Sequence, residues 1–229
     1  SSRYEIIENE VQFQPNHYSD SISYLIGWSQ NPKKIQTISG QTGNSYPTTL
    51  YEWHWLKEDI NNILNSGRIW YSRAVAPGST RGYAFPLETK SSEAWKITGK
   101  VMGRSSTASS ISLEVDDLTI AKQTFDGIPS STYAIKGQEF RIDEEFIPTE
   151  GRIERFKVFY ESSNPNDAGH FEYLGIGVPH ASELLKVGAY SIAGESSISL
   201  STLPDLSVWE ISDLFNPKAF KLNSGTLIT

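Results

Sequence analysis

The sequence predicts a mainly β chain: an antiparallel β-sandwich of the jelly-roll type, with one helix in the N-terminal region and a β-rich C-terminal extension. Four runs alternate apolar and polar side chains, as strands with one buried face do. They span residues 95–102, 111–115, 153–160 and 171–178. Turn-forming residues such as Asp126-Gly127 and Glu150-Gly151 separate the runs. Such a series of short strands is typical of stacked antiparallel sheets.

The N-terminal segment, residues 1–67, carries the one predicted helix, near 49–65. Thr49 and Glu52 have the spacing of a capping box, and Gly67 stands where a C-terminal cap belongs. Apolar residues fall near one helical face between them: Leu50, Trp53, Leu56, Ile60, Ile63 and Leu64. We expect this helix to cover one end or face of the sandwich. A strand is also predicted at residues 22–28.

The sandwich itself is predicted over residues 68–180, and an extension follows over 181–229. The extension contains a short helical or extended piece at 183–187 and a serine-rich strand at 196–201. Its apolar tail includes Trp209 and Phe220. We expect this region to serve oligomerisation.

Composition excludes several classes of partner. The 229 residues carry a net charge of -7, with a pI near 5.2. No concentrated basic patch offsets this charge, so the sequence predicts no nucleic-acid partner and no anionic membrane surface. There is no cysteine, which removes disulfides, thiolate metal ligands and thiol nucleophiles.

No apolar run is long enough to cross a membrane, so we expect no membrane insertion. The chain starts at Ser1-Ser2-Arg3 without an initiator Met or the order of a signal peptide. We therefore expect a fragment or a processed product.

Residues 94–178 resemble the jelly-roll carbohydrate-binding modules of glycan-active enzymes and of bacteriophage tail fibres and spikes. The similarity is carried by WKITGKV, by ISLEV leading into a Phe-Asp-Gly turn, by QEFRIDEEFIP, by RFKVFYES, and by the closing GHFEYLGIGV. The resemblance implies a sandwich fold and glycan binding. Many such modules hold a structural calcium with an acidic pair in the closing strand, whereas here Glu172 is followed by Tyr173.

Aromatic residues are the first candidates for a glycan site. The C–H faces of sugars stack on Trp and Tyr rings, while polar side chains beside the rings bond the hydroxyls. We predict a ligand site formed by Tyr71, Tyr83 and Trp95 with the polar side chains Arg81 and Asp126. The alternative is that these rings are interior, because aromatic side chains bury much area.

The carboxylates suggest cation binding more than catalysis. Asp116 and Asp117 follow a predicted strand, and loop oxygens suit calcium. Adjacent residues on a strand point to opposite faces, so this pair does not form a two-carboxylate hydrolase site. We expect no cofactor; a structural calcium is the one ion that these residues allow.

No nucleophilic site is evident elsewhere. The four histidines lack metal-ligand spacing, and no Gly-x-Ser-x-Gly motif is present. Gly175 and Gly177 lie in a strand-like run without a following helix, so they indicate close backbone approach or a bulge rather than a phosphate-binding loop.

The sequence therefore predicts a non-catalytic receptor-binding module, part of a phage tail fibre or spike, which recognises a bacterial surface polysaccharide or lipopolysaccharide. We expect a homotrimer at the virion surface or outside the cell. Two alternatives stay open. One is an accessory or catalytic module of a secreted glycan-active enzyme, and the other is a purely structural trimerisation segment.

Overall fold

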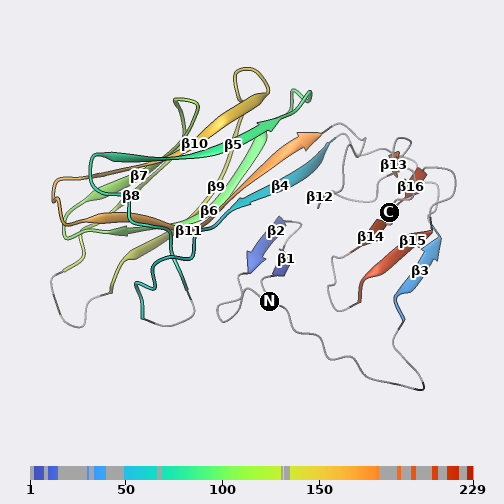
Figure 1. The fold of residues 1–229 in the computed structure, drawn as a ribbon, viewed down its shortest axis with the longest axis horizontal. Coiled ribbons are helices and arrows are strands. Elements are labelled where there is room, and N and C mark those ends of the chain that lie inside the picture. Colours follow the sequence, from blue (N-terminus) through green and yellow to red (C-terminus); the bar gives the residue numbers. More distant parts are fainter. Residues whose placement is uncertain are drawn as a thin grey trace. The chain divides into compact units, whose positions relative to one another are not determined.

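In the computed structural model the chain is mainly β, as predicted (Figure 1). The structure describes residues 3–7, 10–14, 30, 34–39, 49–65, 69–129, 131, 135–180, 190–191, 197–199, 208–210, 216–221 and 226–228. The chain divides into two units, Trp53–Pro179 and the pair of flanking segments Ser1–Glu52 and His180–Thr229. None of the described residues forms a helix, so no helix among them could cross a membrane.

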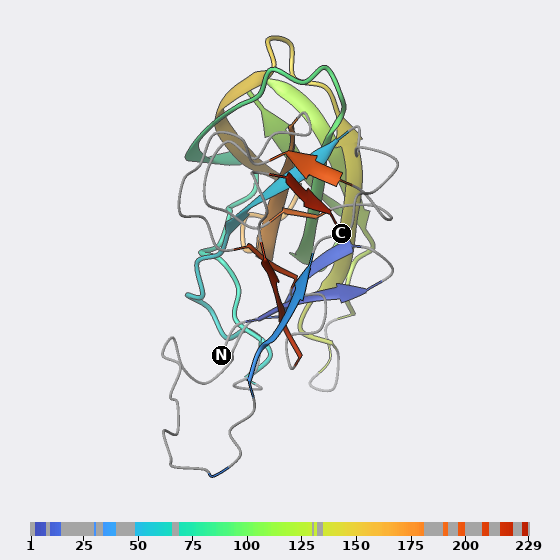
Figure 2. The same cartoon turned by 90° about the vertical axis from the view of Figure 1, so that its right-hand side faces the viewer.

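Two sheets make up the sandwich (Figures 1 and 2). The first has the order β5-β10-β7-β8, with β5 at Ser79–Glu88, β10 at Arg152–Ser162, β7 at Ser109–Val115 and β8 at Leu118–Phe125. The second contains β4-β11-β6-β9, with β4 at Leu50–Leu56, β11 at Ala168–His180, β6 at Trp95–Arg104 and β9 at Gln138–Phe146. The pairs β5–β10, β10–β7, β7–β8, β11–β6 and β6–β9 are antiparallel.

The strand order is that of a jelly roll. β7 pairs with β8, and each earlier strand pairs with the matching later one: β6 with β9, β5 with β10, and β4 with β11. These nested pairs alternate between the two sheets, as they do when one long hairpin is wrapped into a sandwich. The predicted fold class is confirmed.

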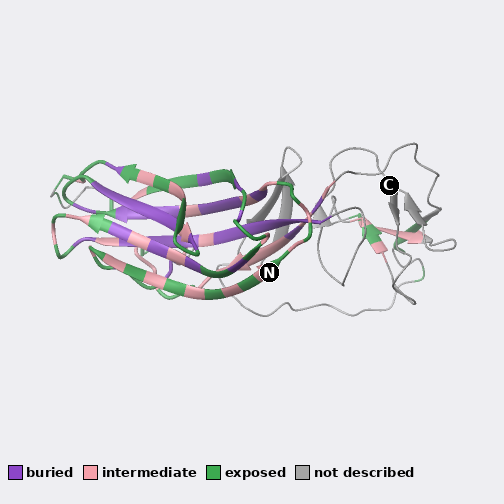
Figure 3. Cartoon of the chain, turned by 90° about the horizontal axis from the view of Figure 1, so that it is seen from above, coloured by how far each residue is buried: buried purple, intermediate pink, exposed green. Residues whose placement is uncertain are grey.

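The core lies between the inner faces of the two sheets, seen as the buried bands of the strands in Figure 3. Both sheets contribute alternate residues, because side chains point to opposite faces along a strand. The larger members are fully or almost fully buried: Trp95, Ile97, Ile111, Leu113, Phe156, Tyr160, Phe171 and Leu174. The residues left over on β4, β11, β6 and β9 form the outer face of the second sheet, where the candidate site lies.

The helix predicted near 49–65 is wrong. β4 runs over Leu50–Leu56, and irregular chain follows it as far as the described residues extend, to Asn65. Asp59 and Asn65 adopt positive φ angles of 51° and 50°, which a right-handed helix does not allow. The segment also alternates with period two, and its aromatic residues favour a pleated, half-buried surface. Gly67, predicted as the cap, lies outside the described residues.

The flanking segments are built from short strands. β1 (Arg3–Ile7) pairs with β2 (Glu10–Gln14), and β13 (Ser197–Ser199) pairs with β16 (Thr226–Ile228). A further sheet contains β14 (Val208–Glu210), β15 (Lys218–Lys221) and β3 (Gln36–Ser39), with β15 and β3 parallel. β12 (Tyr190–Ser191) pairs with residues 51–52 of β4. The predicted serine-rich strand is confirmed as β13; the elements predicted at 22–28 and 183–187 lie outside the described residues.

Candidate functional site

Two of the predicted ligand-binding rings are interior. Tyr71 and Trp95 both have 0% exposed surface. Trp95 packs against Phe146, with ring centroids 6.0 Å apart, inside the sandwich core. Neither ring offers a face to a ligand, so the expectation that they are accessible is wrong; the alternative of interior rings holds for both.

Tyr83 and Arg81 lie on β5, and both side chains interact with other residues of the protein. The Tyr83 ring packs edge-on against Phe171, with centroids 5.7 Å apart. Burial, followed by the charge of Glu58, raises the pKa of Tyr83 to about 12. Arg81 forms an ion pair with Glu58, with Nη1 and Oε1 3.8 Å apart. These side chains are therefore engaged with protein groups.

The predicted residues do not form one site. Asp126 is exposed in the loop after β8, and its backbone N–H donates to Gln138 Oε1 at 3.1 Å. Gln138 begins β9, whereas Trp95 pairs with Phe146 at the other end of the same strand. Eight residue steps at roughly 3.3 Å each separate these ends by about 26 Å. No single small ligand spans that distance.

Asp116 and Asp117 form the two-residue turn between β7 and β8. Both have positive φ angles, 43° and 74°, which is the signature of the tight hairpin turn that matches strand twist. The Asp116 carboxylate accepts the backbone N–H groups of Glu154 and Arg155 at 2.9 and 3.0 Å. These groups lie at the irregularity where β10 shifts register against β5. The Asp116 carboxylate therefore accepts hydrogen bonds from backbone N–H groups at the point where the regular pairing of β10 with β5 is interrupted.

Both carboxylates of this turn already bind protein groups. Asp117 pairs with the Lys157 ammonium, which is the first cause of the lowered pKa of its carboxyl group. Calcium takes six to eight oxygen ligands, including several carboxylates. In the described part of the chain, no three Asp, Glu or His side chains gather closely enough to hold a metal ion. Calcium binding at Asp116 and Asp117 stays a prediction.

The outer face of the second sheet carries a row of aromatic rings that we call the aromatic face: Trp53 and Trp55 on β4 and Tyr173 on β11. Trp53 and Trp55 alternate on one side of β4 and lie nearly parallel, with ring centroids 5.5 Å apart and planes 18° apart. Tyr173 continues the row, 5.9 Å from the Trp55 ring. All three side chains are partly exposed.

Two glycines make room for the indole rings. A Cβ atom on Gly175 would lie 2.5 Å from Trp55 Cζ3, and one on Gly177 would lie 3.2 Å from Trp53 Cζ2. The rings thus lie directly against the bare backbone of β11. The close approach predicted for Gly175 and Gly177 is confirmed. Because both rings are supported by backbone, their positions are fixed before any ligand arrives.

Polar side chains run beside the rings, on the same face of β6 and β9. The antiparallel register pairs Lys96 with Glu145, Thr98 with Asp143, and Lys100 with Arg141. We call these six residues the polar row. The Thr98 hydroxyl donates to Asp143 Oδ1 at 2.5 Å, and Arg141 Nε donates to Asp143 Oδ2 at 2.6 Å. The β11–β6 register sets Gly177, Gly175 and Tyr173 opposite Lys96, Thr98 and Lys100, so the two rows lie side by side.

A partly buried polar cluster lies at one end of this face. Tyr71 donates its hydroxyl to Glu139, and burial followed by this bond raises the pKa of Tyr71 above its ordinary value. Lys100 Nζ lies 3.0 Å from carboxylate oxygens of both Glu139 and Glu172. Burial alone would lower the pKa of Lys100, but Glu172 and Glu139 outweigh it, and the pKa is raised. The cluster fixes the lysine as a cation beside Tyr173.

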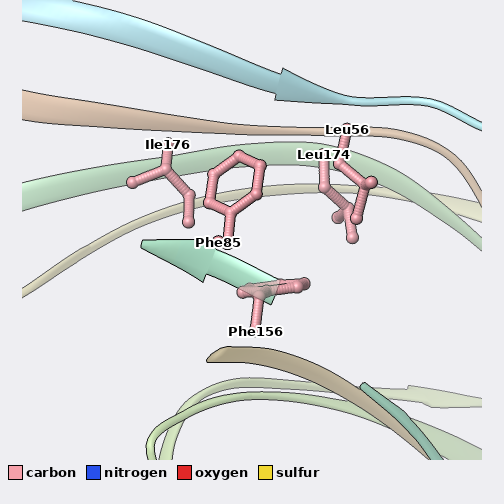
Figure 4. Close-up of a pocket in the computed structure, with 5 residues that line it drawn as sticks. All are labelled: Leu56, Phe85, Phe156, Leu174 and Ile176. Carbon is pink, nitrogen blue, oxygen red and sulfur yellow. The ribbon is translucent and has the colours of Figure 1, made fainter. Parts of the chain in front are cut away.

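The crevice between the two sheets is not a competing site. A narrow crevice between the sheets is lined by Leu56, Phe85, Phe156, Leu174 and Ile176 (Figure 4). In Figure 4 these apolar side chains point toward one another from opposite sides of the core. Binding sites for polar ligands need a few convergent polar groups. This crevice has none and belongs to the core packing.

Sequence reasoning missed the aromatic face because it placed residues 50–56 in a helix. The signal was present: Trp53 and Trp55 alternate in a Trp-His-Trp run, and Gly175 and Gly177 have the same spacing. On strands, both pairs must lie on a single face each. The sequence alone does not predict that β4 and β11 are adjacent in the sheet.

No protein-family model matches the chain, and no curated protein matches it. Two carbohydrate-binding modules are among its structural neighbours. The CBM36-1 domain of a multidomain xylanase from the hindgut metagenome of Trinervitermes trinervoides is 12% identical, with a TM-score of 0.34, over 55% of this chain and 96% of that one. A CBM36 module in complex with calcium and xylotriose is 8% identical, with a TM-score of 0.33, over 54% of this chain and 98% of that one.

A much fuller similarity exists to dimeric latent PorU from Porphyromonas gingivalis. The two are 15% identical, with a TM-score of 0.73, and the match covers 99% of this chain but 23% of PorU. The chain thus spans about a quarter of the length of that protein. At this identity the similarity concerns the fold alone: the chain is similar in fold to one part of PorU.

Proposed function

We propose that this protein is a non-catalytic carbohydrate-binding module and that the glycan binds along the aromatic face. The observation that carries the proposal is the pair of parallel indoles, Trp53 and Trp55, held against glycines beside a row of hydrogen-bonding side chains. This is a combination that sugars require, because a pyranose has an apolar C–H face and a rim of hydroxyls.

The rings supply the stacking surface. Trp53 and Trp55 lie one strand pleat apart, a spacing that lets successive sugar units of an extended chain stack on successive rings. Tyr173 extends the surface in the same direction. A row of this kind suits a polysaccharide better than a single sugar, because each unit adds a contact.

The polar row supplies direction and specificity. Hydroxyl groups both donate and accept hydrogen bonds, so they match a surface of alternating cations and carboxylates. Side chains at the open end are accessible: Lys96 and Arg141 are each 39% exposed, Asp143 is 42% exposed and Glu145 is 62% exposed. The short bonds between Thr98, Asp143 and Arg141 hold these groups in place before a sugar binds.

We also propose where the module acts. Extended polysaccharides lie outside cells, so the module would act at a cell surface, in the extracellular space, or on a virion. The sequence predicts a phage tail fibre, a trimer and a surface polysaccharide or lipopolysaccharide partner; nothing in the described residues bears on the fibre or the trimer, and both stay predictions. The match to one part of a longer protein supports a module within a larger chain.

The test measures binding of the protein to a panel of soluble polysaccharides by affinity electrophoresis and calorimetry. We expect one or more of them to bind, and we expect Trp55→Ala to weaken that binding by on the order of ten- to thirtyfold, about 1–2 kcal/mol. Trp209→Ala is the matched control, because Trp209 is 48% exposed and lies on β14. Equal loss in both variants, or no loss in either, would reject the aromatic face as the site.

A structural role within a larger protein is the second candidate. It is favoured by the fold match, which covers nearly the whole chain against a quarter of PorU. If that role is the right one, the parent chain binds no polysaccharide in the panel. Product analysis of the same incubations tests the absence of catalysis, because we expect no release of oligosaccharide.

A further inference from the structure

The charges beside the aromatic face point to a class of glycan. The polar row contains three cations, and each one is paired with a carboxylate. Lys96 lies 3.8 Å from Glu145, and Arg141 bonds Asp143 at 2.6 Å. Lys100 lies 3.0 Å from both Glu139 and Glu172. Each cation of the polar row therefore has a carboxylate partner.

Beside the rings the balance of charge is negative. The three cations of the polar row stand against the four carboxylates that pair with them, so this group of charges carries one negative charge in excess. The whole chain adds to this field with its net charge of -7. The carboxylates of Asp143 and Glu145, 42% and 62% exposed, are also more accessible than their cationic partners. An approaching anion meets negative groups first.

Resting on the proposed function, we infer that the module selects neutral polysaccharides and rejects anionic ones. A uronate, phosphate or sulfate group on the glycan would have to break an existing ion pair or lie against an exposed carboxylate, and both are unfavourable. Neutral hydroxyls can bond both members of each ion pair without separating them. The inference runs against the lipopolysaccharide partner expected from the sequence, since that glycan is anionic.

The experiment compares one neutral polysaccharide with its carboxymethylated derivative, so that backbone and linkage are the same. We expect the neutral polymer to bind the parent chain and the carboxymethylated one to bind at least roughly tenfold more weakly at low salt. Added salt should reduce the difference, because the repulsion is between exposed charges. Trp55→Ala should weaken binding of the neutral polymer.

A charge-reversal variant tests the cause. Glu145→Lys changes this group of charges from one excess negative charge to one excess positive charge, and it removes the carboxylate that pairs with Lys96. We expect it to bind the carboxymethylated polymer several-fold more tightly than the parent does. Glu154→Lys makes the same change in net charge on β10, in the other sheet, and should have little effect.

The possible outcomes separate the two proposals. Binding of the carboxymethylated polymer as tight as that of the neutral one, or equal gains in Glu145→Lys and Glu154→Lys, would overturn the inference about charge while leaving glycan binding intact. If the parent chain binds no polymer of either kind across the panel, the proposed function fails, and the inference fails with it.

Discussion

Substituting Gly175 by alanine tests the structure of the aromatic face without touching any aromatic residue. The added Cβ would lie 2.5, 2.7 and 2.9 Å from three atoms of the Trp55 ring. Ordinary carbon contacts begin near 3.5 Å, so the ring must move. The ring is a rigid bicycle packed against Trp53 and Tyr173, and it has little room to swing away.

The expected loss of folding stability in Gly175→Ala can be compared with that of two other glycine-to-alanine variants. Overpacking of this kind costs about 1–3 kcal/mol, and alanine recovers roughly 0.5–1 kcal/mol relative to glycine in an extended strand. We therefore expect Gly175→Ala to lower the free energy of unfolding by about 1–2 kcal/mol. A Cβ on Gly177 meets the Trp53 ring at 3.2 Å, so Gly177→Ala should be close to neutral. A Cβ on Gly82 meets nothing within 4 Å, so Gly82→Ala should be neutral or slightly stabilising.

Urea unfolding followed by far-UV circular dichroism gives the three midpoints, and glycan affinity is measured on the same proteins. We expect stability to rank Gly82→Ala above Gly177→Ala above Gly175→Ala. Affinity should fall on the order of tenfold for Gly175→Ala alone, because only there is an indole displaced. If Gly175→Ala unfolds at the same urea concentration as Gly82→Ala, then Trp55 does not lie against β11 and the site geometry is wrong.

Four further substitutions probe the core, the hairpin turn and the histidine beside Tyr71. Trp95→Ala should lower the free energy of unfolding by about 3–5 kcal/mol, because it empties a fully buried site; a melting temperature within a degree or so of the parent's would contradict this. Asp116→Ala should cost about 1–3 kcal/mol, because two backbone N–H groups of β10 lose their acceptor. Asp117→Ala, which breaks an exposed pair with Lys157, should shift the urea midpoint much less, and equal shifts would count against the role given to Asp116. Burial lowers the pKa of His170 below 6.5, so the unfolded chain binds a proton more readily than the folded one. The stability due to neutral His170 is complete above pH 6.5 and is lost as the pH falls below 6.5 toward the folded pKa; melting temperatures between pH 7 and 5 should therefore fall less steeply in His170→Gln than in the parent, and parallel curves would refute it.

The fold class could be predicted from the sequence because period-two alternation is a local signal. A strand with one buried face has apolar and polar residues in alternation, as residues 95–102 and 153–160 do. The close approach at Gly175 and Gly177 was readable for the same reason, since glycines in a strand mark places where something else comes near. The Asp116-Asp117 turn was also placed correctly at the end of a strand.

The segment 49–65 shows where local signals conflict. Its dense apolar residues satisfy a helical spacing and an alternating one at once, and the capping residues favoured the helix. Pairing of β4 with β11 decided the matter, because it sets the two indoles against glycines. That contact joins residues more than a hundred positions apart, and no local pattern encodes it.

The sequence by itself determined that aromatic and hydroxyl-binding residues are plentiful in a β-sandwich, and only the tertiary structure decided which of them reach the surface. Trp95 and Trp55 each have one apolar and one polar neighbour in the sequence, yet Trp95 is fully buried and Trp55 is partly exposed. The physical reason is that a strand has two equivalent faces. Which face is covered depends on the second sheet, whose strands come from distant parts of the chain.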